Sequence, residues 1–149
     1  MKVFTDPKGN RWTQDYYTYL FNAGAALAAA ANATAVVPVE ADSTFVLVKM
    51  AYFADIAGAA QTDSTFVVPL VTVSITDTGS GRNLQQNPVP IDAIAGRGQL
   101  PFVLPVPREF QANSSIQCTF SNFSAATTYA NLRLMLIGYK KYFLSQVKQ

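Results

Sequence analysis

The chain of 149 residues contains no histidine and one cysteine, which limits the chemistry that its side chains can perform. Without histidine there is no Ser-His-Asp triad, no Cys-His pair and no His-containing zinc site. A pair of carboxylates would still suffice for glycoside hydrolysis, and the candidates are Asp55, Asp63, Asp77, Asp92 and Glu109. Most of these acids lie in turn-like contexts, where aspartate bonds the local backbone. We therefore expect a protein that is not an enzyme and that uses no cofactor and no metal ion.

The single cysteine, Cys118, lies in the segment SIQCTF, where Ile116, Cys118 and Phe120 alternate with polar residues. This alternation is typical of a half-buried strand and places the thiol on the apolar face, where it acts as a small hydrophobic group. One thiol forms no disulfide within the chain, so the cysteine content does not indicate an oxidising compartment.

Aromatic and basic residues are concentrated towards the two ends of the chain. The segment RWTQDYYTYLF carries five aromatic residues in eleven, and GYKKYF carries three beside two lysines. Aromatic side chains mixed with cations are typical of the centres of protein interfaces. We therefore predict a surface for contact with a partner or a neighbouring subunit that comprises Lys2, Lys8, Arg11, Trp12, Tyr16, Tyr17, Lys140, Lys141, Tyr142 and Phe143. The alternative is that part of these aromatics fills the base of a β-sandwich.

The charges follow the same distribution. Six of the eleven Lys and Arg residues lie in residues 2–11 and 140–148, whereas residues 12–139 contain five basic and eight acidic residues, a net charge of −3. Basic ends on a mildly acidic body favour arms that contact a separate negative surface, although terminal lysines also keep frayed ends soluble. The overall net charge of +2 is too small to favour binding of nucleic acid.

The low charge content indicates an assembly. Only 13% of the residues are charged, against about 25% in an average soluble domain. A monomer of this composition would expose much neutral or apolar surface, and large apolar patches usually mark interaction sites. We expect a subunit of an assembly, with a tightly folded secreted monomer as the alternative.

The segment AGAALAAAANATA (23–35) contains nine alanines in thirteen residues. The acidic and aromatic residues before it do not fit a signal peptide. A membrane span needs about 20 strongly apolar residues, which this segment lacks. Alanine favours a helix, whereas Gly24, the β-branched residues within 34–37 and the β-rich sequence downstream favour extended chain. We expect residues 16–39 to be extended or irregular, with a helix as the alternative.

From residue 34 onward the alternation of apolar and polar residues predicts strands. The strongest segments are 43–53, 65–76, 114–123 and 131–142. The polar turn SAATTY joins the last two of them. Residues 77–83 have the composition of a turn. Five prolines between residues 88 and 107 predict short strands or loops there.

About eight strands without a long helix indicate an all-β fold, a single-domain antiparallel β-sandwich or jelly roll. Within this one domain we expect residues 1–39 to form an extended N-terminal arm with the first strand or strands. Residues 40–142 would form the body of the sandwich, and residues 143–149 a C-terminal tail.

Four segments of the chain resemble small virion proteins of tailed bacteriophages, of the capsid cement or decoration type. They are ADSTFVLVKMAYFADIAGA, PLVTVSITDTGSGRNLQQNPVPI, GRGQLPFVLPVPREFQANSSIQCTFSNFS and NLRLMLIGYKKY. The resemblance covers residues 40–142 and is one of strand and turn pattern. It implies a jelly-roll or sandwich body, no enzymatic activity, and multimers fixed to the outside of a capsid shell.

The expected partners are accordingly the major capsid protein and further copies of this chain, as a homo-oligomer, with no nucleic acid and no membrane. The protein would be assembled in the bacterial cytoplasm and located on the surface of the virion. The alternative function is a carbohydrate- or receptor-binding sandwich of a phage fibre, neck or tail, because exposed Tyr and Trp rings also stack on sugars.

Overall fold

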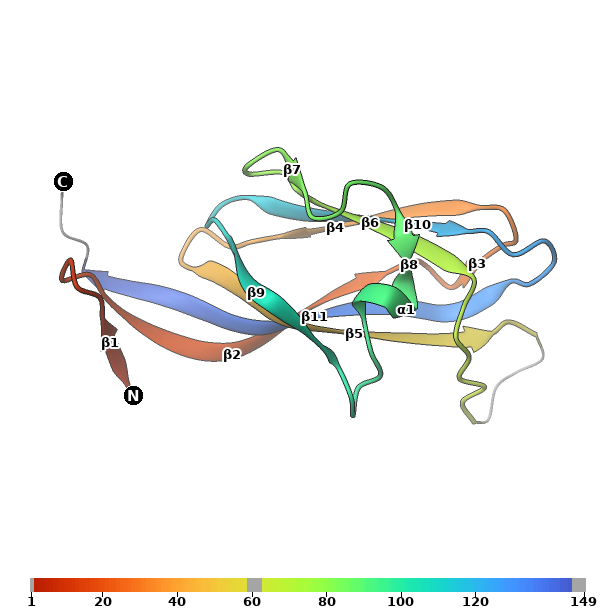
Figure 1. Ribbon diagram of the computed structural model, residues 1–149, viewed down its shortest axis with the longest axis horizontal. Helices are drawn as coiled ribbons and strands as arrows, with labels where there is room; N and C mark the ends of the chain where they lie inside the picture. The colour runs from red at the N-terminus through yellow and green to blue at the C-terminus, as the bar shows by residue number, and fades with distance from the viewer. Residues whose placement is uncertain (1, 59–62, 146–149) are drawn as a thin grey trace.

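Two antiparallel β-sheets face each other in the computed structural model, which describes residues 2–58 and 63–145 (Figure 1). The larger sheet has the order β1-β2-β11-β5-β9, with β3 added to β11. Its strands are β1 (Val3–Thr5), β2 (Arg11–Asn22), β3 (Ala26–Leu27), β5 (Thr44–Ile56), β9 (Phe102–Phe110) and β11 (Tyr129–Ser145). The smaller sheet has the order β4-β10-β6-β7, with β8 added to β6. Its strands are β4 (Asn32–Pro38), β6 (Val71–Asp77), β7 (Arg82–Asn83), β8 (Val89–Pro90) and β10 (Ser115–Asn122).

The strands pair in a nested order. β2 pairs with β11, β4 with β10, β5 with β9, and β6 with both β7 and β8. Successive pairs in this series lie alternately in the larger and the smaller sheet, which is the connectivity of a jelly roll. The predicted all-β sandwich is therefore confirmed. The described residues contain eleven strands where the sequence predicted about eight, because β1, β3, β7 and β8 have only two or three residues each and are too short for a periodic pattern.

Alternating side chains build the core between the sheets. The apolar residues of β6, β10 and β11 that face inward are completely or almost completely buried: Val71, Val73, Ile75, Ile116, Cys118, Phe120, Leu132, Leu134 and Leu136. The prediction for Cys118 is confirmed. Burial raises the pKa of its thiol to about 12, so the sulfur remains a neutral packing group.

Two segments differ from the prediction around prolines. β6 begins only at Val71, so residues 65–70 lie outside it, and Pro69 falls in this irregular stretch as expected for a residue without an amide hydrogen. The proline-rich segment 88–107 contains the one-turn helix α1 (Ile91–Ile94) and most of β9. β9 is an edge strand, and Pro105 and Pro107 lie where its register shifts and it leaves the ladder with β5.

The alanine-rich segment is extended or irregular, as predicted, with a turn at residues 29–30, and it carries the chain from one sheet to the other. Residues 26–27 pair with β11 in the larger sheet, and residues 32–38 pair with β10 in the smaller sheet. The buried Asn122 side chain supports this crossing by donating hydrogen bonds to the carbonyls of Leu27 and Ala28, both at 3.1 Å. Because residues 11–38 form strands of both sheets, the expected boundary between an arm and a body at residue 39 does not divide the structure.

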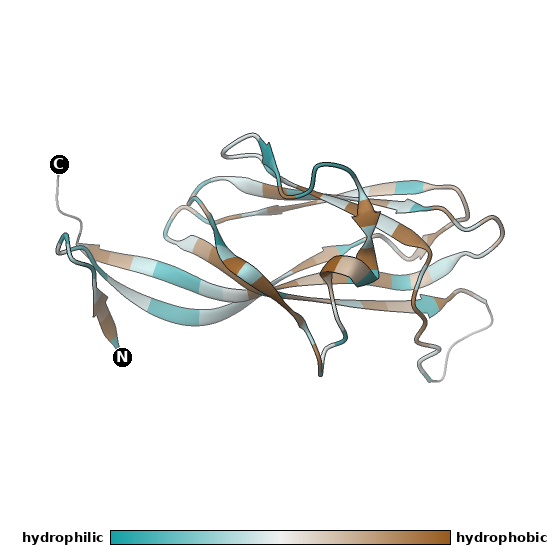
Figure 2. Cartoon of the chain, in the orientation of Figure 1, coloured by the Kyte–Doolittle hydropathy of each residue, from teal (hydrophilic) through white to brown (hydrophobic). Residues whose placement is uncertain are grey.

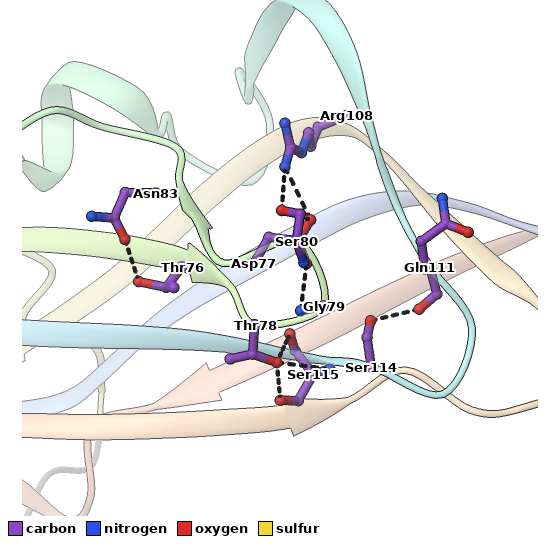
Figure 3. A network of polar contacts seen from close by, with 10 residues as sticks. All are labelled: Thr76, Asp77, Thr78, Gly79, Ser80, Asn83, Arg108, Gln111, Ser114 and Ser115. Atoms are coloured by element: carbon purple, nitrogen blue, oxygen red, sulfur yellow. Dashed lines mark hydrogen bonds and ion pairs between the residues drawn. The ribbon is translucent and has the colours of Figure 1, made fainter.

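An ion pair links the two sheets at one end of the sandwich. Figure 3 shows Arg108 of β9 reaching Asp77, the last residue of β6, at 3.0 Å, and also the hydroxyl of Ser80. Burial alone would raise the pKa of Asp77, but hydrogen bonds from Arg108, Ser80 and Gly79 hold it below its ordinary value. This carboxylate, which the sequence offered as a catalytic candidate, therefore has structural partners.

The first and last long strands continue beyond the smaller sheet (Figure 1). We call the projecting part, residues 3–17 with residues 138–145, the ribbon. It starts at Gly138, which pairs with Tyr17 on one side and Leu47 on the other. A Cβ atom at Gly138 would overlap the carbonyl oxygen of Val46. Glycine is required here because the β5 backbone approaches β11 closely.

Gly138→Ala is predicted to lower the free energy of unfolding by about 3 kcal/mol, the upper end of the usual cost of overpacking. The methyl group meets backbone and cannot be accommodated by a side-chain rotation. Gly58→Ala is the matched control, because a Cβ there meets nothing within 4 Å. Urea unfolding followed by circular dichroism gives the free energy of unfolding of both variants. If Gly138→Ala were as stable as the wild type, the β5 backbone could not lie as close to Gly138 as described.

Candidate functional site

The aromatic residues predicted from the two ends of the chain lie side by side on β2 and β11. In the antiparallel register Trp12 is opposite Phe143, Thr13 is opposite Tyr142, and Tyr16 is opposite Tyr139. The structure thus brings together two groups of residues that are more than 120 positions apart in the sequence. They occupy two faces, because side chains alternate along a strand. Trp12, Tyr16 and Phe143 point away from the smaller sheet, whereas Tyr17, Lys140 and Tyr142 lie on the inward face. The outward rings belong to the ribbon, whereas Tyr19 and Phe21 of the same segment are buried in the core, so the alternative holds for these two.

Three strands each contribute one ring to an aromatic row at the outer end of the ribbon. The rings of Phe4 and Trp12 are stacked, with centroids 6.0 Å apart and an interplanar angle of 15°, and Phe143 lies 6.3 Å from Trp12 on the other side. The ammonium groups of Lys2 and Lys141 lie 5.0 Å from the centroids of Phe4 and Trp12, respectively. Figure 2 shows apolar residues at this outer end and hydrophilic residues on both strands behind it.

Tyr16 is the aromatic residue that the ribbon offers most openly to a partner. Its side chain is 76% exposed, and its hydroxyl accepts a hydrogen bond from the Thr18 hydroxyl at 2.8 Å. This bond holds the ring along the face of β2 that points away from the smaller sheet. An exposed ring fixed in one orientation contributes apolar contact area at a low entropic cost.

Lys140 points inward and is only 4% exposed, so it does not present its charge to a partner as the sequence analysis expected. Its Nζ atom lies 2.7 Å from an Oε atom of Glu40 and 3.8 Å from the centroid of the Tyr17 ring. The Tyr19 hydroxyl donates a hydrogen bond to the same Glu40 carboxylate. We call Lys140, Glu40, Tyr17 and Tyr19 the lysine clamp.

The pKa values within the lysine clamp follow from these contacts. Burial alone would raise the pKa of Glu40, but the hydrogen bonds from Lys140 and Tyr19 outweigh it and hold the pKa below its ordinary value. Burial alone would lower the pKa of Lys140, and its hydrogen bond and charge interaction with Glu40 reverse this and raise it. Burial and the hydrogen bond to Glu40 raise the pKa of Tyr19. Lys140 is therefore a positively charged structural group throughout the neutral range.

Lys141 faces the opposite side of β11 and is also paired. Its Nζ atom lies 3.5 Å from a carboxylate oxygen of Glu109. Two of the five cations predicted for the contact surface are thus ion-paired within the chain. Lys2, Lys8 and Arg11 are the cations of this set that remain exposed, so the electrostatic part of any contact is smaller than the sequence suggested.

The outward face of the larger sheet continues from the ribbon into a groove that sequence reasoning missed. This outer groove has a volume of about 940 Å³ and is lined by Thr18, Leu20, Tyr52, Phe53, Phe66, Arg97, Gly98, Gln99, Arg133 and Met135. A signal for it was present in β11, where the outward-facing Met135 and Ile137 make the strand apolar on both faces. Such a pattern indicates that both faces of a strand are covered.

The acids considered for catalysis form no group that could hold a metal. Asp55 is buried and accepts hydrogen bonds from Ser64 and Asn131, at 2.9 and 3.2 Å. In the part of the chain that the structure describes, no three His, Cys, Asp or Glu side chains are placed to bind one metal ion. Within the same residues no helix has the length and apolar character needed to cross a membrane.

No protein-family model matches the chain, and no curated protein matches it. The resemblance to capsid cement proteins accordingly rests on the four segments of the sequence alone.

Lys140→Ala is predicted to lower the free energy of unfolding by about 1.5–3 kcal/mol, the usual range for a hydrogen bond to a charged group. Lys141→Ala should cost no more than about 1 kcal/mol, because its ion pair with Glu109 is exposed. Urea unfolding compares the two variants. The double variant Glu40→Gln/Lys140→Ala should lose less free energy of unfolding than the sum of the losses of the two single variants. If Lys140→Ala and Lys141→Ala lowered the free energy of unfolding equally, the lysine clamp would be refuted.

Proposed function

We propose that this chain is a non-enzymatic structural protein of a virion that binds the outside of a phage capsid and associates with copies of itself. The observation that carries the proposal is the ribbon, which presents exposed rings and cations beyond the body of a jelly roll. Jelly rolls occur both in viral capsid proteins and in lectins. The fold alone therefore does not select the function, and the surface has to do so.

The chemistry of the ribbon suits contact with a large protein surface. Tyr16 and Phe143 are 76% and 37% exposed, and Leu144 is 51% exposed. Burying such side chains against the major capsid protein stabilises a complex independently of salt. Lys2, Lys8 and Arg11 add attraction to an acidic shell, but exposed ion pairs contribute only about 0–1 kcal/mol each. Apolar contact would therefore provide most of the affinity.

Self-association is supported by apolar side chains at the edge of the larger sheet. Leu100, Val103 and Val106 are 82%, 57% and 75% exposed. All three belong to the turn that precedes β9 or to β9 itself. A contact between copies would remove this apolar surface from water and explain the low charge content of the chain.

The alternative function is a carbohydrate- or receptor-binding sandwich of a phage fibre, neck or tail. The exposed ring of Tyr16 favours it, because an open aromatic face stacks on a sugar as readily as on a protein side chain. Strong and specific hits for the purified protein on a glycan array would select this alternative.

Tyr16→Ala is predicted to reduce occupancy on capsids at least about tenfold, because the variant loses the most exposed ring of the ribbon. Phe123→Ala is the matched control, since this ring is 54% exposed in the loop after β10 and outside the ribbon. Co-sedimentation of each variant with capsids stripped of the protein measures occupancy. Binding of wild-type protein should persist at high salt, where charge interactions are screened.

Two results would contradict the proposal. One is equal occupancy of Tyr16→Ala, Phe123→Ala and the wild type on stripped capsids. The other is the absence of this protein from the shell in cryo-electron microscopy maps of purified particles.

A further inference from the structure

The outer groove combines an apolar floor with two cations. Its floor is formed by Leu20 of β2, Met135 of β11 and Phe53 of β5, which lie on three neighbouring strands of the larger sheet. Arg97 and Arg133 also line it, and none of its ten lining residues is acidic. Apolar sites with a few fixed polar groups are the usual form of a binding site in proteins.

Arg97 is held in place by its surroundings. Its guanidinium carbon lies 4.0 Å from the centroid of the Phe66 ring, so the planar group lies over the aromatic face. The turn that presents it is tight, because the Leu100 amide donates a hydrogen bond to the Arg97 carbonyl at 2.9 Å. A Cβ at Gly96 would overlap the carbonyl oxygen of Leu100, so this turn also requires glycine at 96. A guanidinium fixed on a ring keeps its N–H groups free for a carboxylate.

Arg133 enters the groove from the middle of the sheet. It lies on β11 between Phe53 of β5 and Asn22 of β2 and is exposed. Among the described residues neither Arg97 nor Arg133 forms a salt bridge. Asp92 is close enough for its charge to act on Tyr52 at the groove, but it is not ion-paired with Arg97 either. The groove therefore has two cations that form no ion pair within residues 2–58 and 63–145.

The shape of the groove favours a segment carried by another protein. It lies on a sheet face and is more open than enclosed. A small molecule in a binding site usually has about 70–90% of its surface buried, which an open groove does not provide. A peptide segment that belongs to a partner brings with it the protein surface that closes the open side and excludes water.

We propose that the outer groove binds an acidic peptide segment of a partner protein. An aromatic or aliphatic side chain of that segment would lie on the floor formed by Leu20, Phe53 and Met135, and its carboxylates would pair with Arg97 and Arg133. This inference goes beyond the proposed function and does not depend on it, because it concerns a different part of the surface and makes no claim about a virion.

Selection from a random heptapeptide library displayed on an unrelated carrier tests the inference without assuming a sequence. The wild-type chain is the bait, and the Arg97→Gln/Arg133→Gln double variant is the counter-selection. Enriched peptides should combine Asp or Glu with Phe, Tyr, Trp or Leu. Synthetic fluorescein-labelled copies then give dissociation constants by anisotropy. The double variant should bind at least about tenfold more weakly, whereas Arg82→Gln, on the other sheet, should stay within about twofold of the wild type.

Leu20→Glu provides a second test, since a carboxylate on the apolar floor should repel the acidic peptides while leaving this exposed position of β2 folded. Circular dichroism confirms that each variant is folded. Failure to enrich any peptide, enrichment of peptides without acids, or equal binding to the wild type and the double variant would overturn the inference. Displacement of the peptides by an equimolar amount of 3-phenylpropionate would also overturn it, in favour of a small-molecule site.

Discussion

The ladder between β2 and β11 pairs twelve positions, from Asn22 with Arg133 to Arg11 with Ser145. β11 lies between β2 and β5, so the larger sheet would separate into two parts without it. The chain must therefore bring its first and last long strands together before this sheet is complete. Such pairing over a long sequence separation is slow to form because loop closure opposes it. The same ladder carries the exposed rings of the ribbon, so fold and contact surface depend on one interaction.

The residue types on the inward face of β11 change at the point where the smaller sheet ends. Leu132, Leu134 and Leu136 pack against that sheet, Gly138 admits the β5 backbone, and Lys140 enters the lysine clamp. At this position of the alternation a buried cation, Lys140, lies between the Glu40 carboxylate and two tyrosine rings where the sandwich body has leucines. The outward faces differ as well. The smaller sheet exposes mainly threonine, serine and asparagine, whereas the larger sheet carries the apolar outer groove and the ribbon.

Strict alternation made much of the fold predictable. β10 and the inward residues of β6 follow the pattern of apolar and polar residues, and so does the burial of Cys118. The same alternation, extended from Leu136 through Gly138, also places Lys140 on the inward face, but its charge suggested a surface position. The partner that makes its burial possible is Glu40, one hundred residues away, and no local pattern shows that pairing. The outer groove was missed for a similar reason, because Phe66 and Arg97 meet it from loops whose course depends on tertiary contacts.

Amide hydrogen exchange along β2 and β11 tests most directly whether the two end strands form one continuous ladder. We predict that those amides in residues 13–17 and 138–142 that point towards a neighbouring strand exchange at least about a hundredfold more slowly than in an unstructured peptide. Protection should extend past the last residue of β11 that pairs with β5, Lys141. Exchange at unprotected rates from Gly138 outward, with a protected sandwich, would contradict the account, because the rings of the ribbon would then have no fixed surface.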